Sequence, residues 1–560
     1  MSIYSSFPNP KLCLKKPVLS SRLIGFIIFF SAIILYGLGP SRNYHYADDS
    51  MRWAFGIASA ENYLINSHHL FLNVLRVIQS AVGVEPMHFL AFYSALLGAL
   101  GLVWLYYLLC LTQCRRLALY GVLICAFSAG YWSYSIAGDV YVPAASLIIG
   151  GLYAVVKGIT TDNFRSAWHY ALLSIFLFIL AIMHHQAFFF IVLGLFPAVL
   201  LMRRTSFRKI LIFGIMTPLL VGLLTTCIYA VAYYTLPEND TLTFLDFTKG
   251  YVTDFLAYPD MKNIIGFKNI INGFAGGSRA FISYNFLFKS SQFAHYIQNK
   301  FPYRHVYTQV YLVKNTSFGV ALISGICAGV VLVLGSILTC LGIFVAFRKR
   351  RTLFLVVLTV IPQAVFFLWW EPISDEFWIW LLPILALSIT TGARLLKKKA
   401  KLVLSILISC LLIGTFSTSI LVFLDASNDI DQVNKQYISM LTEKDLLIGF
   451  DEVVSNNRIK LDQQSQGFKY FNLFVKMSKG HRIDLQNLNK EIDLALNRGG
   501  KVFVDPYLIN SPTSYFELIK INNPYFKEDY SRVLTLLEGV NSDRVIWLPL
   551  RERVNGFFKK

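Results

Sequence analysis

The sequence has few charged residues for its length, and acidic residues are the scarcer of the two signs. Only 15% of the 560 residues are charged, with 32 Asp and Glu against 51 Lys and Arg, while 55% are hydrophobic. No water-soluble domain of this size needs so much apolar surface, which excludes a soluble globular protein. In a soluble chain the net charge of +19 would suggest nucleic acid. Here most of the excess positive charge lies in loops between apolar runs, where anionic lipid headgroups are the better partner. We therefore expect membrane lipids and no nucleic acid as partners.

Several familiar signals are also missing. The 8 cysteines fall mostly in or beside apolar runs and show neither metal-ligand spacing nor a disulfide framework. An apolar run from Leu23 to Gly39 follows a basic N-terminal region, but no small-residue cleavage site follows it. We therefore expect an uncleaved first span and no signal peptide. The chain has no internal repeat, and its last part has no phosphate-binding glycine motif.

Basic residues are concentrated in every second loop between the apolar runs. The clusters are Lys11/Lys15/Lys16/Arg22, Arg115/Arg116, Lys157/Arg165, Arg203/Arg204/Arg208/Lys209, Arg348/Lys349/Arg350/Arg351 and Arg394/Lys397/Lys398/Lys399/Lys401. Cationic loops resist translocation, so these clusters fix the cytoplasmic side. The loops between them carry acids, histidines and tryptophans and are expected to face outward.

The apolar runs predict a polytopic α-helical membrane protein with about eleven transmembrane helices, at roughly 20 residues for each crossing. They lie near 23–39, 87–112, 117–136, 141–156, 168–183, 187–202, 210–234, 318–346, 353–370, 377–393 and 402–424. With an odd number of crossings, a cytoplasmic N-terminus puts the C-terminus outside.

Two outer loops are long, and the composition changes after Phe423. In the first loop, Ala60–Ala81 suits a helix lying along the membrane surface. The second loop, 236–318, mixes aromatic and basic residues that belong at the headgroup level. We expect residues 1–424 to form the membrane domain and 425–560 a small accessory α/β domain outside, with strands at Leu446–Phe450, Lys501–Val504 and Arg544–Leu548 and a helix at Leu485–Asn497.

Five outer segments carry polar residues that suit chemistry or binding. They are Tyr44–Arg52 with the acidic pair Asp48-Asp49, Asn66–His69 with His68 and His69, Asp139–Tyr141, His184–Gln186 and Trp370–Trp378. Each has a structural alternative: Asp49 or Ser50 as the cap of a helix through Trp53, interfacial histidines, Asp139 capping the fourth span, a polar turn, and an interfacial tryptophan belt. For the acidic pair alone the capping alternative is favoured, but five polar turns at one membrane face favour a site.

The order of these segments resembles the GT-C superfamily of membrane glycosyltransferases, which includes protein O-mannosyltransferases and the aminoarabinose transferases of lipid A. The resemblance covers roughly residues 20–395 in layout, through short, degenerate motifs. Asp48-Asp49 matches the acidic pair of the first outer loop, and Asn66–Leu70 is similar to its His-containing segment, with His69 where many relatives have Pro. Asp139-Val140-Tyr141 resembles the Glu-x-Tyr turn, with Asp in place of Glu.

The resemblance implies a sugar donor on a polyprenyl phosphate, a hydroxyl acceptor and inversion, in a bacterial plasma membrane. Asp49 or Asp48 would be the general base. The phosphate would be held by Arg52, His68, His69 or the loop residues Lys289, Arg304 and His305. Trp370 and Trp378 would line a groove for acceptor or lipid. The remaining candidate substrate-binding residues are Asp139, Tyr141, His184, His185, Glu371, Asp375 and Glu376. The resemblance leaves a divalent cation open.

Two other classes remain open at this point. A transporter or lipid flippase usually has ionisable or broken-helix sites at the bilayer midplane and related halves, whereas here the acids cluster at one face. A polysaccharide polymerase or ligase is also outer-facing and lipid-linked, but it takes a glycan chain in place of a single sugar.

The charge alternation makes a direct prediction about topology. A reporter fused after Lys401 should behave as cytoplasmic and one fused after Asp425 as external, because 402–424 is expected to cross the membrane. Paired phosphatase and fluorescent-protein fusions measure this. If both positions report the same side, the last predicted span does not cross the membrane, and two cytoplasmic reporters would place the C-terminal domain in the cytoplasm.

Overall fold

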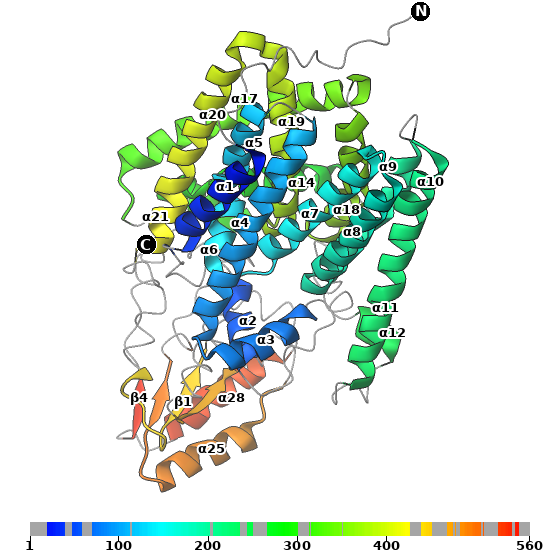
Figure 1. Cartoon of the computed structure of the whole chain (residues 1–560). Coiled ribbons are helices and arrows are strands. Elements are labelled where there is room, and N and C mark those ends of the chain that lie inside the picture. Colours follow the sequence, from blue (N-terminus) through cyan, green and yellow to red (C-terminus); the bar gives the residue numbers. More distant parts are fainter. Residues whose placement is uncertain are drawn as a thin grey trace, which may run out of the picture.

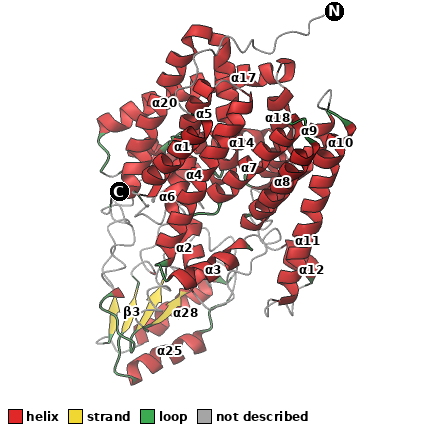
Figure 2. Ribbon diagram, viewed as in Figure 1, coloured by secondary structure: helices red, strands yellow, loops and turns green. Residues whose placement is uncertain are grey.

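The structure is a computed structural model. The structure describes residues 20–37, 39, 48–58, 70–112, 115–201, 205–235, 243–249, 266–300, 313, 315–349, 351–425, 438–450, 467–473, 477, 482–505, 508, 525–539 and 544–547. Helices form the body of the molecule, and the strands gather at one end (Figures 1 and 2).

Each predicted apolar run coincides with one helix or with consecutive helical pieces. These are α1 (Ser21–Gly37), α4 (Pro86–Thr112), α5 (Arg115–Ala126) with α6 (Ala129–Ala137), α7 (Tyr141–Thr160), α8 (Phe164–His184), η4 (Gln186–Phe188) with α9 (Phe189–Leu200), α10 (Phe207–Lys209) with η5 (Ile210–Met216) and α11 (Thr217–Thr235), α17 (Phe318–Lys349), α18 (Arg351–Trp370), η9 (Glu376–Leu381) with α19 (Leu382–Ala393), and α20 (Ala400–Thr415) with η11 (Phe416–Ile420) and α21 (Leu421–Leu424).

The protein is an integral membrane protein. Within the described residues, 6 helical stretches are long and apolar enough to cross a membrane, and α5 with α6, bent by 59°, makes up to 7. One of the 6 stretches, Glu376–Leu424, covers two predicted spans and is broken at Lys397, where φ is 49°. The predicted number of crossings stays a prediction.

Short helices lie between the spans. They are α2 (Asp48–Ala58), α3 (Phe71–Val82), α12 (Phe244–Lys249), α14 (Phe267–Phe281), η8 (Asn285–Lys289) and α15 (Ser291–Lys300). Within the predicted segment a helix is confirmed over Phe71–Val82, and α3 runs across the end of the bundle in Figure 1. Its place on the membrane surface stays a prediction. We call the end of the bundle that carries α2 and α3 the α2–α3 end.

The opposite end carries the basic clusters that the structure describes. Lys209 Nζ donates hydrogen bonds to the carbonyl oxygens of Ile159 (2.7 Å) and Thr161 (2.6 Å), where α7 ends. A basic residue at a helix C-terminus also complements the helix dipole. The loop after α7 and the loop before η5 therefore lie at the same end of the bundle, as the charge alternation predicts.

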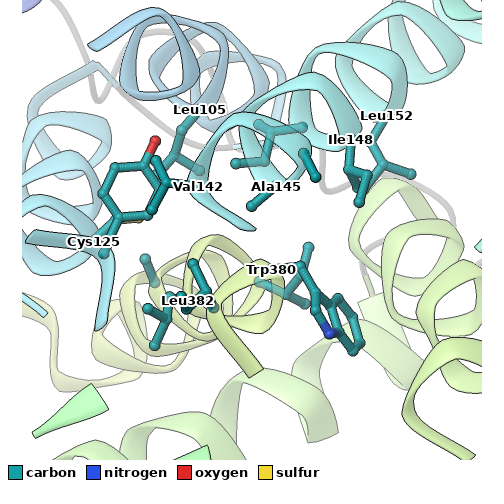
Figure 3. Close-up of a cluster of buried hydrophobic side chains, with 14 of the residues drawn as sticks. Leu105, Cys125, Val142, Ala145, Ile148, Leu152, Trp380 and Leu382 are labelled. Carbon is teal, nitrogen blue, oxygen red and sulfur yellow. The ribbon is translucent and has the colours of Figure 1, made fainter. Parts of the chain in front are cut away.

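Helix α7 forms the centre of the membrane part and is buried along nearly its whole length. It packs against α4, α8 and η9. Figure 3 shows Val142, Ala145 and Ile148 of this helix in one apolar cluster with Trp380 and Leu382. The start of α7, at Tyr141, is thus fixed by a packed core.

Helices α17 and α19 approach each other through two glycines. A Cβ atom on Gly342 would overlap the carbonyl oxygen of Ser388, and one on Gly392 would overlap the carbonyl oxygen of Leu338. Small residues that let two backbones approach closely are typical of helix pairs in membranes. The contact holds α19, and with it η9, against the bundle.

The C-terminal part contains a four-stranded parallel sheet in the order β2-β1-β3-β4. The predicted strands are confirmed as β1 (Leu446–Gly449), β3 (Val502–Val504) and β4 (Val545–Trp547), and the predicted helix as α25 (Leu485–Asn497). The sequence analysis missed β2 (Lys469–Asn472) and α28 (Phe526–Gly539). Residues of α25 and α28 share one apolar core with the sheet. The boundary at 425 and the accessory role stay predictions.

The glycine contact predicts a difference between Gly→Ala substitutions at a packed and at an open helix position. Gly392→Ala should destabilise the protein by about 1–3 kcal/mol, because the added methyl group overpacks a backbone contact. The matched control is Gly329→Ala in α17, where a Cβ atom would meet nothing within 4 Å. There the better helix propensity of Ala should leave stability unchanged or slightly higher. Thermal unfolding in detergent measures both, and equal midpoints would contradict the close approach.

Candidate functional site

Three of the five polar segments meet at the α2–α3 end. The ring of Tyr141 lies 5.3 Å from the ring of His185 and 5.5 Å from that of Phe377, and the rings of His185 and Phe377 are 6.0 Å apart. All three side chains are buried. We call Tyr141, His185 and Phe377 the aromatic triangle. The predicted turns at 139–141, 184–186 and 370–378 are therefore neighbours in space, although they come from distant parts of the chain.

The turn before Tyr141 is held tightly against α4. Helix α6 ends at Gly138, whose φ is +79°, and a Cβ atom there would lie 2.9 Å from the backbone nitrogen of Ala91. Ser94 Oγ donates a hydrogen bond to the carbonyl oxygen of Asp139 at 2.7 Å. The buried Asp139 carboxylate accepts from the N–H of Val140, just before α7. The carboxylate therefore lies beside the N-terminal end of α7, although the cap residue is Val140 and no side chain caps the helix by a hydrogen bond.

His185 is oriented by the backbone that follows it. Its Nδ1 accepts a hydrogen bond from the N–H of Ala187 at 3.2 Å, as the cap of η4. In the neutral ring the proton then sits on Nε2, which is a hydrogen-bond donor. The next residue, Gln186, donates from Nε2 to the carbonyl oxygen of Thr248 in α12 at 2.6 Å. The turn therefore ties the second long loop to the bundle beside the aromatic triangle.

His184 has a supporting position. Its Nδ1 lies 2.7 Å from the carbonyl oxygen of Leu180, and its Nε2 lies 2.6 Å from Tyr93 Oη. A carbonyl only accepts, so Nδ1 donates, and Nε2 of the neutral ring accepts from the tyrosine hydroxyl. Phe71, the first residue of α3, stacks on the same imidazole with ring centroids 4.2 Å apart. His184 therefore docks α3 onto α4 and α8, one residue away from the aromatic triangle.

The segment 370–378 is largely engaged within the protein. Trp378 is buried and donates from Nε1 to the carbonyl oxygen of Pro372 at 2.8 Å, and Trp370 is buried against Phe366, with ring centroids 5.6 Å apart. The Asp375 carboxylate forms an ion pair with Arg279 of α14, with Nη2 3.2 Å from Oδ1. Glu371 and Glu376 are half-buried. The predicted substrate contacts of this segment stay predictions.

The predicted acids lie on α2. The helix starts at Asp48, so Asp49 and Ser50 fall in its first turn, and the helix expected through Trp53 is confirmed, although its start precedes the predicted cap. Trp53, Ala54 and Ile57 bury α2 in the main core, against α4 and α3. The side chains of Asp48, Asp49 and Arg52 lie outside the described part, as do His68, His69, Arg304 and His305. Lys289 is exposed.

Three residues of this region were missed by the sequence analysis. Phe71 and Tyr93 hold His184, and Arg279 holds Asp375. No motif marks them, because each acquires its partner through tertiary packing. Among the residues that the structure describes, no group of three or more His, Cys, Asp or Glu side chains is arranged to hold a metal ion.

Comparison with known proteins gives a match at the level of structure. No family model and no curated protein sequence matches the chain. A solved structure of the oligosaccharyltransferase of Archaeoglobus fulgidus, tethered to an acceptor peptide with an NVT sequon, is similar with a TM-score of 0.50 and 11% identity, over 91% of this chain and 72% of that one. ArnT from Cupriavidus metallidurans bound to undecaprenyl phosphate gives a TM-score of 0.45 and 12% identity, over 86% and 88%.

These likenesses concern the fold. The chain shares the overall fold of that oligosaccharyltransferase structure, and the polytopic helical fold expected from the sequence is confirmed.

The docking of α3 predicts the effect of removing one hydroxyl. Tyr93→Phe keeps the ring but leaves His184 Nε2 buried without a donor, which should cost about 1–3 kcal/mol of stability. Tyr170→Phe is the matched control, because Tyr170 is a partly buried tyrosine of α8 whose hydroxyl forms no hydrogen bond with the described residues, and its loss should change stability little. Thermal unfolding in detergent compares the two. Equal unfolding midpoints would show that the Tyr93–His184 hydrogen bond does not support the docking of α3.

Proposed function

We propose that this protein is a glycosyltransferase that moves a sugar from a polyprenyl-phosphate donor to a hydroxyl acceptor at the outer face of the bacterial plasma membrane. The α2–α3 end is the outer face in this proposal. The observation that supports it most directly is that three polar turns meet at the aromatic triangle. This triangle includes His185, the residue after His184, which holds α3 against the bundle. GT-C architecture and the interfacial position of the acids fit the same reaction.

The chemistry assigned to the site needs a base and a cationic or hydrogen-bonding cradle. Asp49 or Asp48, at the start of α2, takes the proton of the acceptor hydroxyl. The acceptor oxygen forms a bond to the anomeric carbon from the face opposite the phosphate, and the bond from that carbon to the phosphate oxygen breaks. The configuration inverts, and the electron pair leaves with the polyprenyl phosphate.

The phosphate is a good leaving group, so a strong general acid is not required. Its negative charge is stabilised by Arg52 and by hydrogen-bond donors of the site. His185 is suited to this role, because the cap of η4 leaves its Nε2–H as the donor. His184 serves the site indirectly, through α3.

Two features favour this proposal over a transporter or flippase. The three polar turns that the structure describes meet at one end of the bundle, whereas transport sites usually lie at the midplane between related halves. The sequence shows no internal repeat. A polymerase or ligase shares the donor chemistry and differs in the length of the transferred glycan.

The test begins with the donor lipid. Native mass spectrometry of the purified full-length protein should show a co-purified polyprenyl-phosphate sugar, and that lipid then serves as substrate for release of polyprenyl phosphate. Asp49→Asn, Asp48→Asn or the double variant should lower turnover about a hundredfold to ten-thousandfold, with donor binding retained, because a general base is lost.

Glu85→Gln is the matched control. Glu85 is an exposed acid at the same end that pairs, within the described residues, with His88 near the start of α4, and its loss should leave turnover unchanged. Turnover within a few-fold of wild type in both single Asn variants and in the double variant would remove this mechanism and favour a transporter.

A further inference from the structure

Helix α14 has two faces of opposite character. One face carries Asn269, Gly273, Gly276 and Ala280, which are buried. The other carries Phe267, Ile270, Ile271 and Phe274, which are 77%, 53%, 52% and 62% exposed. These four residues follow the i, i+3, i+4, i+7 spacing of one helix face, and we call them the apolar stripe.

The glycine face is seated closely on the end of α18 and the turn that follows it. A Cβ atom on Gly273 would overlap Leu368, and one on Gly276 would overlap the carbonyl oxygen of Pro372 and lie 2.8 Å from Trp378 Nε1. A side chain at either position would displace α14 from the end of α18 and the turn that follows it. The close approach therefore fixes which face of α14 points away from the protein.

Polar contacts lock the helix at both ends. The Asn269 carboxamide accepts from the N–H of Gly266 at 3.3 Å and donates to the carbonyl oxygen of Leu368 at 3.0 Å. At the other end, Arg279 forms its ion pair with Asp375, whose side chain is only 12% exposed. A charge-assisted pair with a mostly buried partner is stronger than a pair on an open surface.

The position of the stripe indicates what covers it. On α18, Ile361 and Val365 are exposed, and Leu368 follows them on the same helix face by the i, i+4, i+7 spacing. In an integral membrane protein this exposed face of α18 contacts lipid. Leu368 packs against Gly273 on the buried face of α14, so α14 covers the end of this exposed face of α18 and its opposite face, the apolar stripe, points outward there.

The positions of the basic residues on α14 fit a helix that lies at the level of the lipid headgroups. Lys268 is exposed beside the start of the stripe, and Arg279 near the end of the helix is half exposed. Long basic side chains extend from an apolar surface to reach lipid headgroups. An amphipathic helix with bulky apolar residues on one face and basic residues at its edges lies in the membrane interface, with that face among the acyl chains.

We propose that α14 is an in-plane membrane anchor whose apolar stripe inserts among the acyl chains of the leaflet at the α2–α3 end, and that the Arg279–Asp375 pair transmits this anchorage to the turn that carries Phe377. Phe377 belongs to the aromatic triangle, so the anchor sets the depth of the triangle relative to the headgroups. In this role Asp375 is a positioning residue. The proposal does not depend on the reaction catalysed.

The depth of the stripe is tested on the full-length protein in nanodiscs of phosphatidylethanolamine and phosphatidylglycerol. The 8 native cysteines make thiol labelling unspecific, so the spin label is carried by p-acetylphenylalanine in place of Phe274. Reference labels replace Val333, an exposed residue within α17, and Lys490, an exposed residue on α25. Power saturation with oxygen and with a water-soluble nickel complex measures accessibility.

The label at position 274 should resemble the label at position 333, with high access to oxygen and low access to nickel. Access to nickel equal to that at position 490 would overturn the proposal, because the stripe would then face water. Protection from both reagents would also overturn it, because a protein segment or a second copy would then cover the stripe. Protection that arises only on adding polyprenyl phosphate would assign the stripe to the donor lipid and equally overturn it.

A charge swap tests the transmission step. Arg279→Gln should increase the mobility of the label at position 274, and the pair Arg279→Asp with Asp375→Arg should restore the wild-type spectrum. An unchanged spectrum in Arg279→Gln would remove the role of the ion pair. None of these readouts uses catalytic activity, so failure here is distinguishable from failure of the proposed reaction.

Discussion

The cost of placing charge in hydrocarbon is the constraint on which the rest of the structure depends. Charged side chains within a bilayer are expensive unless they are paired or reach water. In this chain the basic clusters lie in every second loop between the apolar runs, and the five polar segments lie in other loops. When long helices have apolar sides and polar termini, their few polar groups lie together at the ends of the bundle. The aromatic triangle is the result of that sorting combined with the packing around α7.

Packing within the bundle then gives the polar turns their geometry. Tyr141 begins a helix that is buried on nearly all sides, so its ring is placed by a core in which Val142, Ala145 and Ile148 meet the helices around them (Figure 3). Phe377 lies in η9, which leads into α19, and α19 is held by the glycine contact with α17. A rigid scaffold beneath short turns is the usual way to position a site.

The sequence predicted what depends on periodicity and composition. Each apolar run is a helix, and α25 has the predicted limits because Asp484 caps it and glycines close it. The sequence did not reveal the strand at Lys469–Asn472, because four residues with polar ends carry little pattern. It also did not reveal the partners of His184 and Asp375. Phe71, Tyr93 and Arg279 are ordinary residues of their own helices, and only the tertiary fold brings them to those side chains.

The two adjacent histidines at the end of α8 contact different partners. His184 is the last residue of the helix and faces Tyr93 and Phe71, whereas His185 has left the helix and faces Tyr141. Successive residues on an α-helix differ in direction by about 100°, because a turn contains 3.6 residues. Inserting one residue within α8 would therefore move His184 into the position of His185, and deleting one would move His185 into the position of His184. Either change leaves one of the two positions without an imidazole. The number of residues in α8, and not only the presence of two histidines, therefore determines which partners each imidazole contacts.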